Sequence, residues 1–251
     1  MYFFVVVVVV FTLLITVSWS TTRESSTSYI DVMQTVSSSM KIPQKVNDNW
    51  NKFAPEVKRS IYNDEQCKSF LSTHFGDRFS TKFDYLENGA HKADLFRYAW
   101  LYIHGGVYMD IKTVLIKPFQ ELFPDPSVCY MVVSDTTITS VPRIYNGIIA
   151  TPPKNPIMYK LMTGVMQMKN EDQYIKNCED GFDIVSSMCV KGLDRYGYKE
   201  TIKDVPSLYV FKETSKSVSE CQYKADRYGM CTFITDKYTN ILKVRYSDYP
   251  W

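Results

Sequence analysis

Charged side chains that could form a polar site gather between residues 91 and 118 of the 251-residue chain. Asp94 and Arg97 lie three positions apart, a spacing that places both on one face of a helix. Asp110 and Lys112 lie two positions apart, a spacing that places both on one side of an extended strand. Taken singly, each pair is typical of a surface ion pair that adds about 0 to 1 kcal/mol of stability. Together, between two apolar segments, they indicate a polar site, because unused charges in apolar surroundings are unfavourable.

A helix, a turn and a strand must position these charges. Residues 92–103 carry apolar side chains at helical spacing, which predicts an amphipathic helix. Gly105 and Gly106 supply the backbone freedom that ends a helix. Residues 107–109 then predict a strand, and the extended run is expected to continue through residues 114–116.

Further strands are predicted at residues 30–36, 58–62, 128–133 and 144–150, and further helices at residues 44–53, 63–71 and 158–168. Alternating strands and helices are typical of an α/β fold in which helices cover both faces of a parallel sheet. Ligands of such sheets bind beyond the carboxyl ends of the strands. Asp110, which follows a predicted strand, is correctly placed for that.

Composition excludes some functions. The net charge is only +2, from 29 basic and 27 acidic side chains, whereas a nucleic-acid-binding protein is expected to carry a concentrated basic stripe. The 19 tyrosines suit a sugar site but are also common in cores and interfaces. A carboxylate-based hydrolase requires two acidic groups at a defined separation, and the sequence allows no such pair to be assigned.

The six cysteines form an even set, which favours disulfides over metal ligation because there is no C-x-x-C motif. The three histidines show no metal-ligand spacing. Short separations favour a bond between Cys178 and Cys189 and another between Cys221 and Cys231, although the sequence leaves other pairings open.

The first 20 residues are predicted to be a signal anchor or a signal peptide, because residues 2–19 are uncharged and include six consecutive valines. Residues 21–28 are rich in Ser and Thr and predict a short stem. Residues 29–251 then form one domain. The expected location is the secretory pathway, in the ER or Golgi membrane with a lumenal domain, or outside the cell if the segment is cleaved.

The strings ADLFRY at residues 93–98 and LYIHGGVYMD at residues 101–110 resemble the DxD sugar-binding region of glycosyltransferase family 32. That family includes initiating mannosyltransferases of the fungal Golgi and is distantly similar to glucosylating bacterial toxins. The resemblance implies a single GT-A-type, Rossmann-like domain with a mostly parallel sheet. It also implies a hexosyltransferase that uses a UDP- or GDP-linked sugar, with retention, and a glycan, glycoprotein or glycolipid acceptor.

The resemblance assigns Asp94 and Arg97 to the hydroxyls of the donor sugar and places Arg97 near the phosphate. Asn146, in the string IYNGIIATPP, resembles an asparagine that approaches the donor sugar, although a turn asparagine at a strand edge explains it equally well. Tyr108 shares a strand side with Asp110, so it either lines the pocket or belongs to the core. Arg97 and Asp110 are the predicted catalytic residues.

Gln34 and Thr35 match two positions of the family's His-Gln-Thr-Trp run, which implies contact with the nucleotide. Met33 and Val36 replace the histidine and the tryptophan. Because Val36 removes the aromatic ring that would stack on the base, we expect weaker or altered nucleotide selection.

The family's metal motif is incomplete, because the sequence reads Asp110-Ile111-Lys112 and lysine replaces the second aspartate. Two arrangements follow. Lys112 substitutes for the ion by binding the diphosphate directly, or Asp110 alone holds Mn²⁺ or Mg²⁺ with the help of the substrate phosphates. The same change also fits a protein that binds sugar nucleotides or glycans without catalysis.

Overall fold

The computed structural model describes residues 31–37, 41–134, 141–170, 174–193, 197–217, 219 and 230–245, with residues 174–179 described by their backbone alone. Their helices are α1 (Gln44–Phe53), α2 (Asp64–Phe75), α3 (Asp77–Tyr85), α4 (Gly89–His104), α5 (Pro156–Gln167), α6 (Tyr174–Ser187) and the 3₁₀ turn η1 (Phe119–Glu121). Their strands are β1 (Asp31–Thr35), β2 (Lys58–Tyr62), β3 (Gly106–Met109), β4 (Val114–Leu115), β5 (Cys129–Val133), β6 (Ile144–Thr151), β7 (Gly197–Lys199), β8 (Leu208–Ser217), β9 (Met230–Asp236) and β10 (Thr239–Lys243).

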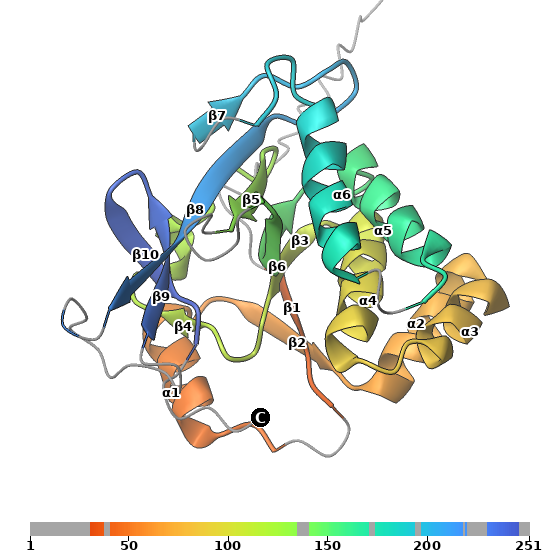
Figure 1. Cartoon of the computed structure of the whole chain (residues 1–251). Coiled ribbons are helices and arrows are strands. Elements are labelled where there is room, and N and C mark those ends of the chain that lie inside the picture. Colours follow the sequence, from red (N-terminus) through yellow and green to blue (C-terminus); the bar gives the residue numbers. More distant parts are fainter. Residues whose placement is uncertain are drawn as a thin grey trace, which may run out of the picture.

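These strands form one sheet in the order β2-β1-β3-β6-β5-β8-β9-β10-β4, with β7 paired to β8 (Figure 1). Strand β1 lies between β2 and β3 and is parallel to both. Strands β5 and β8 are also parallel, whereas the remaining pairs are antiparallel. The α/β class is therefore confirmed. The predicted parallel sheet is found around β1, and the sheet as a whole is mixed.

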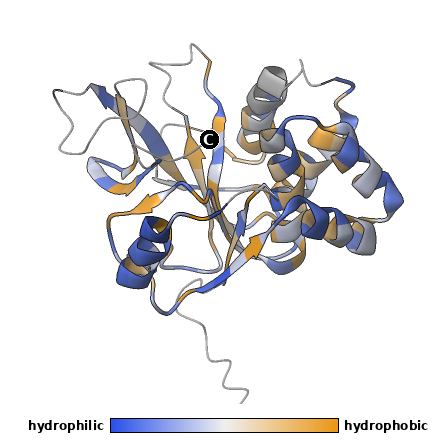
Figure 2. Cartoon of the chain, turned by 90° about the horizontal axis from the view of Figure 1, so that it is seen from below, coloured by the Kyte–Doolittle hydropathy of each residue, from blue (hydrophilic) through white to orange (hydrophobic). Residues whose placement is uncertain are grey.

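Helices cover both faces of the sheet, unequally. Helices α2 to α6 gather on one side of it, and α1 lies apart from them (Figure 1). Alternation along β3 explains the two layers, since Tyr108 packs into the core beneath α2, α4 and α5, and its neighbours Val107 and Met109 pack into the core shared with α1. In Figure 2 the hydrophobic residues gather towards the centre of the molecule, along the strands and the inner helix faces.

Helix α4 is fixed at both ends by local chemistry. The side chain of Asn88 accepts a bond from the backbone nitrogen of Ala90, 2.9 Å away, and caps the first turn. Gly105 ends the helix with a φ of 67°, and Gly106 follows with a φ of 92°. A Cβ on Gly105 would lie 2.6 Å from the backbone nitrogen of Pro153. The double glycine therefore allows both the left-handed backbone and a close approach to the segment after β6.

The segment after β3 differs from the expectation. Residues 114–115 do form a strand, β4, but the predicted continuity with β3 is wrong, because β3 ends at Met109 and the chain turns at once. The amide of Thr113 donates to the carbonyl of Asp110 at 2.9 Å and closes the turn. Strand β4 then pairs with β10, at the far end of the strand order. Asp110 and Lys112 therefore lie in a turn between two strands, and not along one strand.

Two cysteine pairs were favoured by the sequence, and the structure contradicts one of them. Cys67, Cys129 and Cys189 are buried thiols, and the thiol of Cys189 donates to the carbonyl of Val185 at 3.5 Å. The predicted bond between Cys178 and Cys189 is therefore wrong. Cys231 is disulfide-bonded, and the side chains of Cys178 and Cys221 lie outside the described residues.

Across the described ranges, none of the helices combines the length and apolar character needed to cross a membrane. The predicted signal segment at residues 1–20 and the predicted stem at residues 21–28 lie outside those ranges.

Candidate active site

A cavity of about 340 Å³ opens at the carboxyl ends of the parallel strands. Thr35 ends β1, Asp64 follows β2 as the first residue of α2, and Asp110 follows β3. All three line the cavity. Because β1, β2 and β3 run in the same direction, their carboxyl ends meet at one edge, where the chain leaves each strand and exposes polar side chains.

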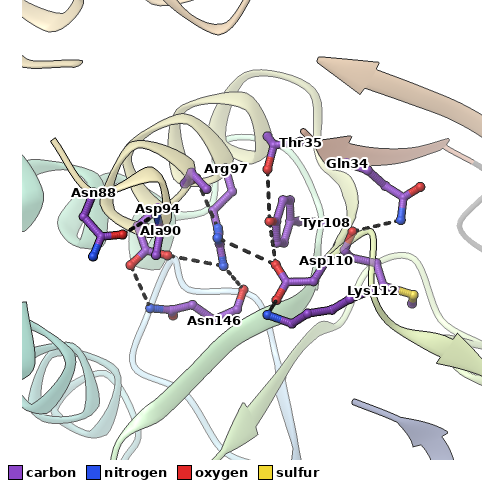
Figure 3. Close-up of polar contacts among 12 residues, drawn as sticks. Gln34, Thr35, Asn88, Ala90, Asp94, Arg97, Tyr108, Asp110, Lys112 and Asn146 are labelled. Atoms are coloured by element: carbon purple, nitrogen blue, oxygen red, sulfur yellow. Dashed lines mark hydrogen bonds and ion pairs between the residues drawn. The ribbon is translucent and has the colours of Figure 1, made fainter. Parts of the chain in front are cut away.

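Arg97 forms the wall of the cavity on the side of α4. Its guanidinium lies over the ring of Tyr108, with the central carbon 4.0 Å from the ring centroid. Its Nη1 lies 3.2 Å from Asp94 Oδ1, and its Nη2 lies 3.8 Å from Asp110 Oδ1. It also donates to the backbone carbonyl of Asn146. The helix, β3 and β6 thus converge on one buried cation (Figure 3).

Asp94 and Asn146 both contact Arg97 from outside the cavity lining. Only 1% of Asp94 is exposed, and neither residue lines the cavity. The side-chain amide of Asn146 donates to Asp94 Oδ2 at 3.3 Å. In this conformation the pair orients Arg97, and the predicted direct contact of Asp94 and Asn146 with a donor sugar stays a prediction.

Asp110 is held from two directions by its own segment (Figure 3). The hydroxyl of Tyr108 donates to Oδ1 at 2.7 Å, and Nζ of Lys112 lies 3.0 Å from Oδ2. Tyr108 is buried, with its hydroxyl 3.3 Å from that of Thr35. It therefore both belongs to the core and lines the cavity, so the two roles considered for Tyr108 hold together.

Burial and neighbouring groups together keep the three ionisable groups at this wall in their ordinary charge states. Burial opposes the charge of Asp110, but Lys112, Arg97 and the Tyr108 hydroxyl outweigh it and hold its pKa below the usual range. Burial likewise opposes the charge of Arg97, yet Tyr108, Asp94 and Asp110 raise its pKa. Burial raises the pKa of Tyr108 well above its ordinary value. The site therefore holds an ionised carboxylate and a permanent cation beside a neutral phenol.

Gln34 lies outside the cavity, and Thr35 lies within it. The side-chain nitrogen of Gln34 donates to the carbonyl of Met109 at 3.1 Å, and its oxygen accepts from Nε of Arg59 at 2.9 Å. Gln34 is fully buried. The structure therefore gives Gln34 a role in joining three strands, and the position that faces the cavity is Thr35.

Two groups that sequence reasoning missed also line the cavity. Asp64 contributes a carboxylate, and the first turn of α4, at Gly89 and Ala90, contributes a helix N-terminus. Asn63 and Asp64 directly follow the predicted strand 58–62, and ligands of such sheets bind beyond the carboxyl ends of the strands. Applied to this strand, the same argument would have predicted Asp64. The direction of α4 depends on tertiary packing, so no local sequence pattern predicted that its N-terminus would line the cavity.

Comparison with known proteins gives this geometry its context. Residues 18–129 match the family described as "Glycosyltransferase sugar-binding region containing DXD motif". All the residues that line the cavity lie within the matched region, whereas the segment of β6 that contacts Arg97 lies outside it. The match covers somewhat less than half of the chain and shows what this region is similar to.

The individual proteins that resemble this chain are distant in sequence. An uncharacterized glycosyltransferase of Acanthamoeba polyphaga mimivirus is 23% identical over 134 residues, which cover 53% of the chain and 52% of the viral protein. An initiation-specific alpha-1,6-mannosyltransferase of Candida albicans is 32% identical over 79 residues, which cover 31% of the chain and 20% of that protein. The matches thus span about half, or less, of these relatives.

Among solved structures, the PaToxG glycosyltransferase aligns with a TM-score of 0.47 and 19% identity, covering 64% of the chain and 68% of that structure. Within the matched region, the segment that resembles a DXD motif is Asp110-Ile111-Lys112, where the first aspartate is present and lysine stands in place of the second.

Proposed function

We propose that this glycosyltransferase moves a hexose from a UDP- or GDP-linked donor to a glycan, glycoprotein or glycolipid, with retention of configuration. The observation that supports the proposal best is the position of Arg97. This cation is buried, held by two carboxylates and a carbonyl, and presented to a cavity at the carboxyl edge of the sheet. A fixed cation at such an edge suits a ligand whose negative charge grows during the reaction.

Sugar transfer breaks the bond between the anomeric carbon and a diphosphate oxygen, and that oxygen keeps the electron pair. Arg97 and Lys112, both at the cavity wall, would stabilise the resulting charge through charge-assisted bonds. The acceptor hydroxyl forms the new bond to the anomeric carbon, and its proton passes to the departing diphosphate. With front-face attack of this kind the configuration is retained and no side chain has to act as a base.

Asp94 and Asn146 act in this proposal as positioning residues. They hold the guanidinium of Arg97 at a fixed angle, so that it reaches the donor without first having to reorganise. Tyr108 supplies the flat surface under the guanidinium and donates to Asp110.

We further propose that the catalytic domain lies in the lumen of the secretory pathway, attached to an ER or Golgi membrane or secreted. Two features support this location. Residues 2–19 form an uncharged apolar run, and Cys231 is disulfide-bonded, a state that persists in oxidising compartments.

The test is to incubate the purified full chain with a panel of UDP- and GDP-sugars and to measure nucleotide release with and without oligosaccharide acceptors. Release that depends on an acceptor is expected. NMR of the product then shows whether the anomeric configuration is retained, and an inverted product would contradict that part of the proposal.

The replacement of the second aspartate by Lys112 favours one competing function, a sugar-nucleotide-binding protein without catalysis. In the same assay this protein would bind a nucleotide but release none from any donor, whatever the acceptor. Arg97→Ala provides the matched negative control, since it removes the cation that the proposal requires.

A further inference from the structure

Both oxygens of the Asp110 carboxylate are already engaged by protein groups. Oδ1 accepts from the Tyr108 hydroxyl at 2.7 Å and lies 3.8 Å from Nη2 of Arg97. Oδ2 lies 3.0 Å from Nζ of Lys112. The side chain of Asp110 is only 17% exposed. A divalent ion that approached this carboxylate would meet an ammonium and a guanidinium before it met a second ligand.

The turn fixes the backbone of Lys112 beside Asp110. Its neighbours Ile111 and Thr113 are buried, and the amide of Thr113 is bonded to the carbonyl of Asp110. Strands β3 and β4 anchor the two ends of the turn. The position that the second aspartate of a DXD motif would occupy is therefore held at the cavity wall, and it carries an ammonium.

The other potential ligands around the cavity are few. Asp64 is the remaining carboxylate among the described side chains that line it. In the described ranges no three His, Cys, Asp or Glu side chains are grouped so that they could hold a metal ion. Mn²⁺ and Mg²⁺ prefer oxygen ligands and bind through carboxylates together with substrate phosphates. The residues present here do not fit the divalent ion that the family motif implies.

Charge explains how the site can work without the ion. Replacing the second aspartate of the motif by Lys112 changes the charge of the wall by two units, which equals the charge of a divalent ion. Lys112 and Arg97 line the same cavity and both contact Asp110. Together they offer a diphosphate several N–H donors and two positive charges.

We propose that this glycosyltransferase binds the diphosphate of its donor without a divalent metal, and that Lys112 takes the place of the metal. The inference rests on the proposed use of a nucleotide-diphosphate sugar. Lys112 exchanges its bond to Asp110 for one to the diphosphate, and Arg97 then remains as the partner of Asp110. The cation at this position is then part of the protein itself, so a chelator cannot remove it.

The experiment measures UDP and GDP binding to the full chain by titration calorimetry, in excess EDTA and in excess MnCl₂. The wild type is expected to bind one of the nucleotides with nearly equal affinity in both buffers. Lys112→Asp restores the D-x-D pattern. It should weaken binding in EDTA on the order of 10- to 100-fold and should recover affinity in MnCl₂. Bound Mn²⁺ should then be visible by electron paramagnetic resonance.

Two controls separate charge from folding. Lys112→Arg keeps the cation and should keep binding in EDTA. Lys117→Asp makes the same change of charge five residues further along the chain, outside the cavity lining, and should behave as the wild type in both buffers.

The outcomes distinguish the two proposals. Wild-type binding that appears only with MnCl₂ would overturn the metal-free site and leave the glycosyltransferase proposal standing. Undiminished binding by Lys112→Asp in EDTA would overturn the role of Lys112. If the wild type bound neither nucleotide in either buffer and released none from any donor, the proposed function would fail, and this inference with it.

Discussion

Nη2 of Arg97 lies 3.8 Å from Oδ1 of Asp110, although one residue belongs to the middle of α4 and the other follows the end of β3. The chain turns back at the double glycine between α4 and β3. This turn brings the side chains of Arg97 and Asp110 to the same wall of the cavity. Tyr108 fills the space beneath the guanidinium. The spacing of Arg97 and Asp110 therefore depends on α4, the glycine turn and β3 together.

Arg97→Lys should lower kcat/KM on the order of 100-fold, because an ammonium cannot contact Asp94, Asp110 and the Asn146 carbonyl at once while stacking on an aromatic ring. Since the positive charge remains, the buried carboxylate of Asp94 keeps a partner and the protein should still fold. Donor turnover and urea unfolding are measured in parallel. Arg78→Lys is the control, on an exposed turn of α3 away from the cavity. Full turnover by Arg97→Lys would show that the transfer site lies elsewhere.

Protonation of Asp110 should make the free energy of unfolding depend on pH in the acidic range. Its folded pKa is lowered, so the folded state binds fewer protons than the unfolded state in the acidic range. The stabilisation is present above the unfolded pKa of about 4 and is lost as pH falls through the lower, folded pKa. The free energy of unfolding of the wild type should thus fall more steeply below about pH 4 than that of Asp110→Asn. Urea titrations at a series of pH values test this, and parallel curves for the two proteins would contradict it.

Gly105→Ala should destabilise the protein by more than Gly76→Ala does. Both glycines end a helix with positive φ, 67° and 82°, so both substitutions place alanine in a disfavoured backbone conformation. Only at Gly105 would the added Cβ also lie 2.6 Å from the backbone of Pro153, whereas at Gly76 it meets nothing within 4 Å. A loss of roughly 1 kcal/mol is expected at Gly76 and a loss of about 2 to 4 kcal/mol at Gly105. Thermal unfolding of the two variants measures the difference.

Local patterns predicted the elements that carry the site. Helix 44–53 and strand 58–62 match α1 and β2 residue for residue, and the predicted helix 92–103 lies within α4. Each has strong local determinants, such as apolar periodicity or a bounded run of strand-forming residues. The contact of Lys112 with Asp110 was also anticipated, although through strand alternation, whereas the turn closed by Thr113 produces it.

Long-range pairing escaped prediction. Strand β4 joins β10, and the burial of Asp94 and Gln34 follows from strands and helices that are distant in sequence. No pattern within residues 91–118 signals that Asn146 from β6 lies behind Arg97. Such contacts depend on the strand order, which the alternating pattern leaves open in a mixed sheet.

Val36→Trp should tighten nucleotide binding. Val36 follows β1, lines the cavity, and is fixed by the bond from its backbone nitrogen to the carbonyl of Tyr62 at 3.0 Å. The resembling family carries an aromatic ring here, and a base stacked on such a ring gains about 1 to 3 kcal/mol, which lowers Kd roughly 5- to 150-fold. Val36→Leu adds apolar volume without a ring and should leave Kd within about twofold, because stacking needs a flat π surface. Calorimetric titration with UDP and GDP makes the measurement, and equal affinities for the tryptophan and leucine variants would place the base at another wall of the cavity.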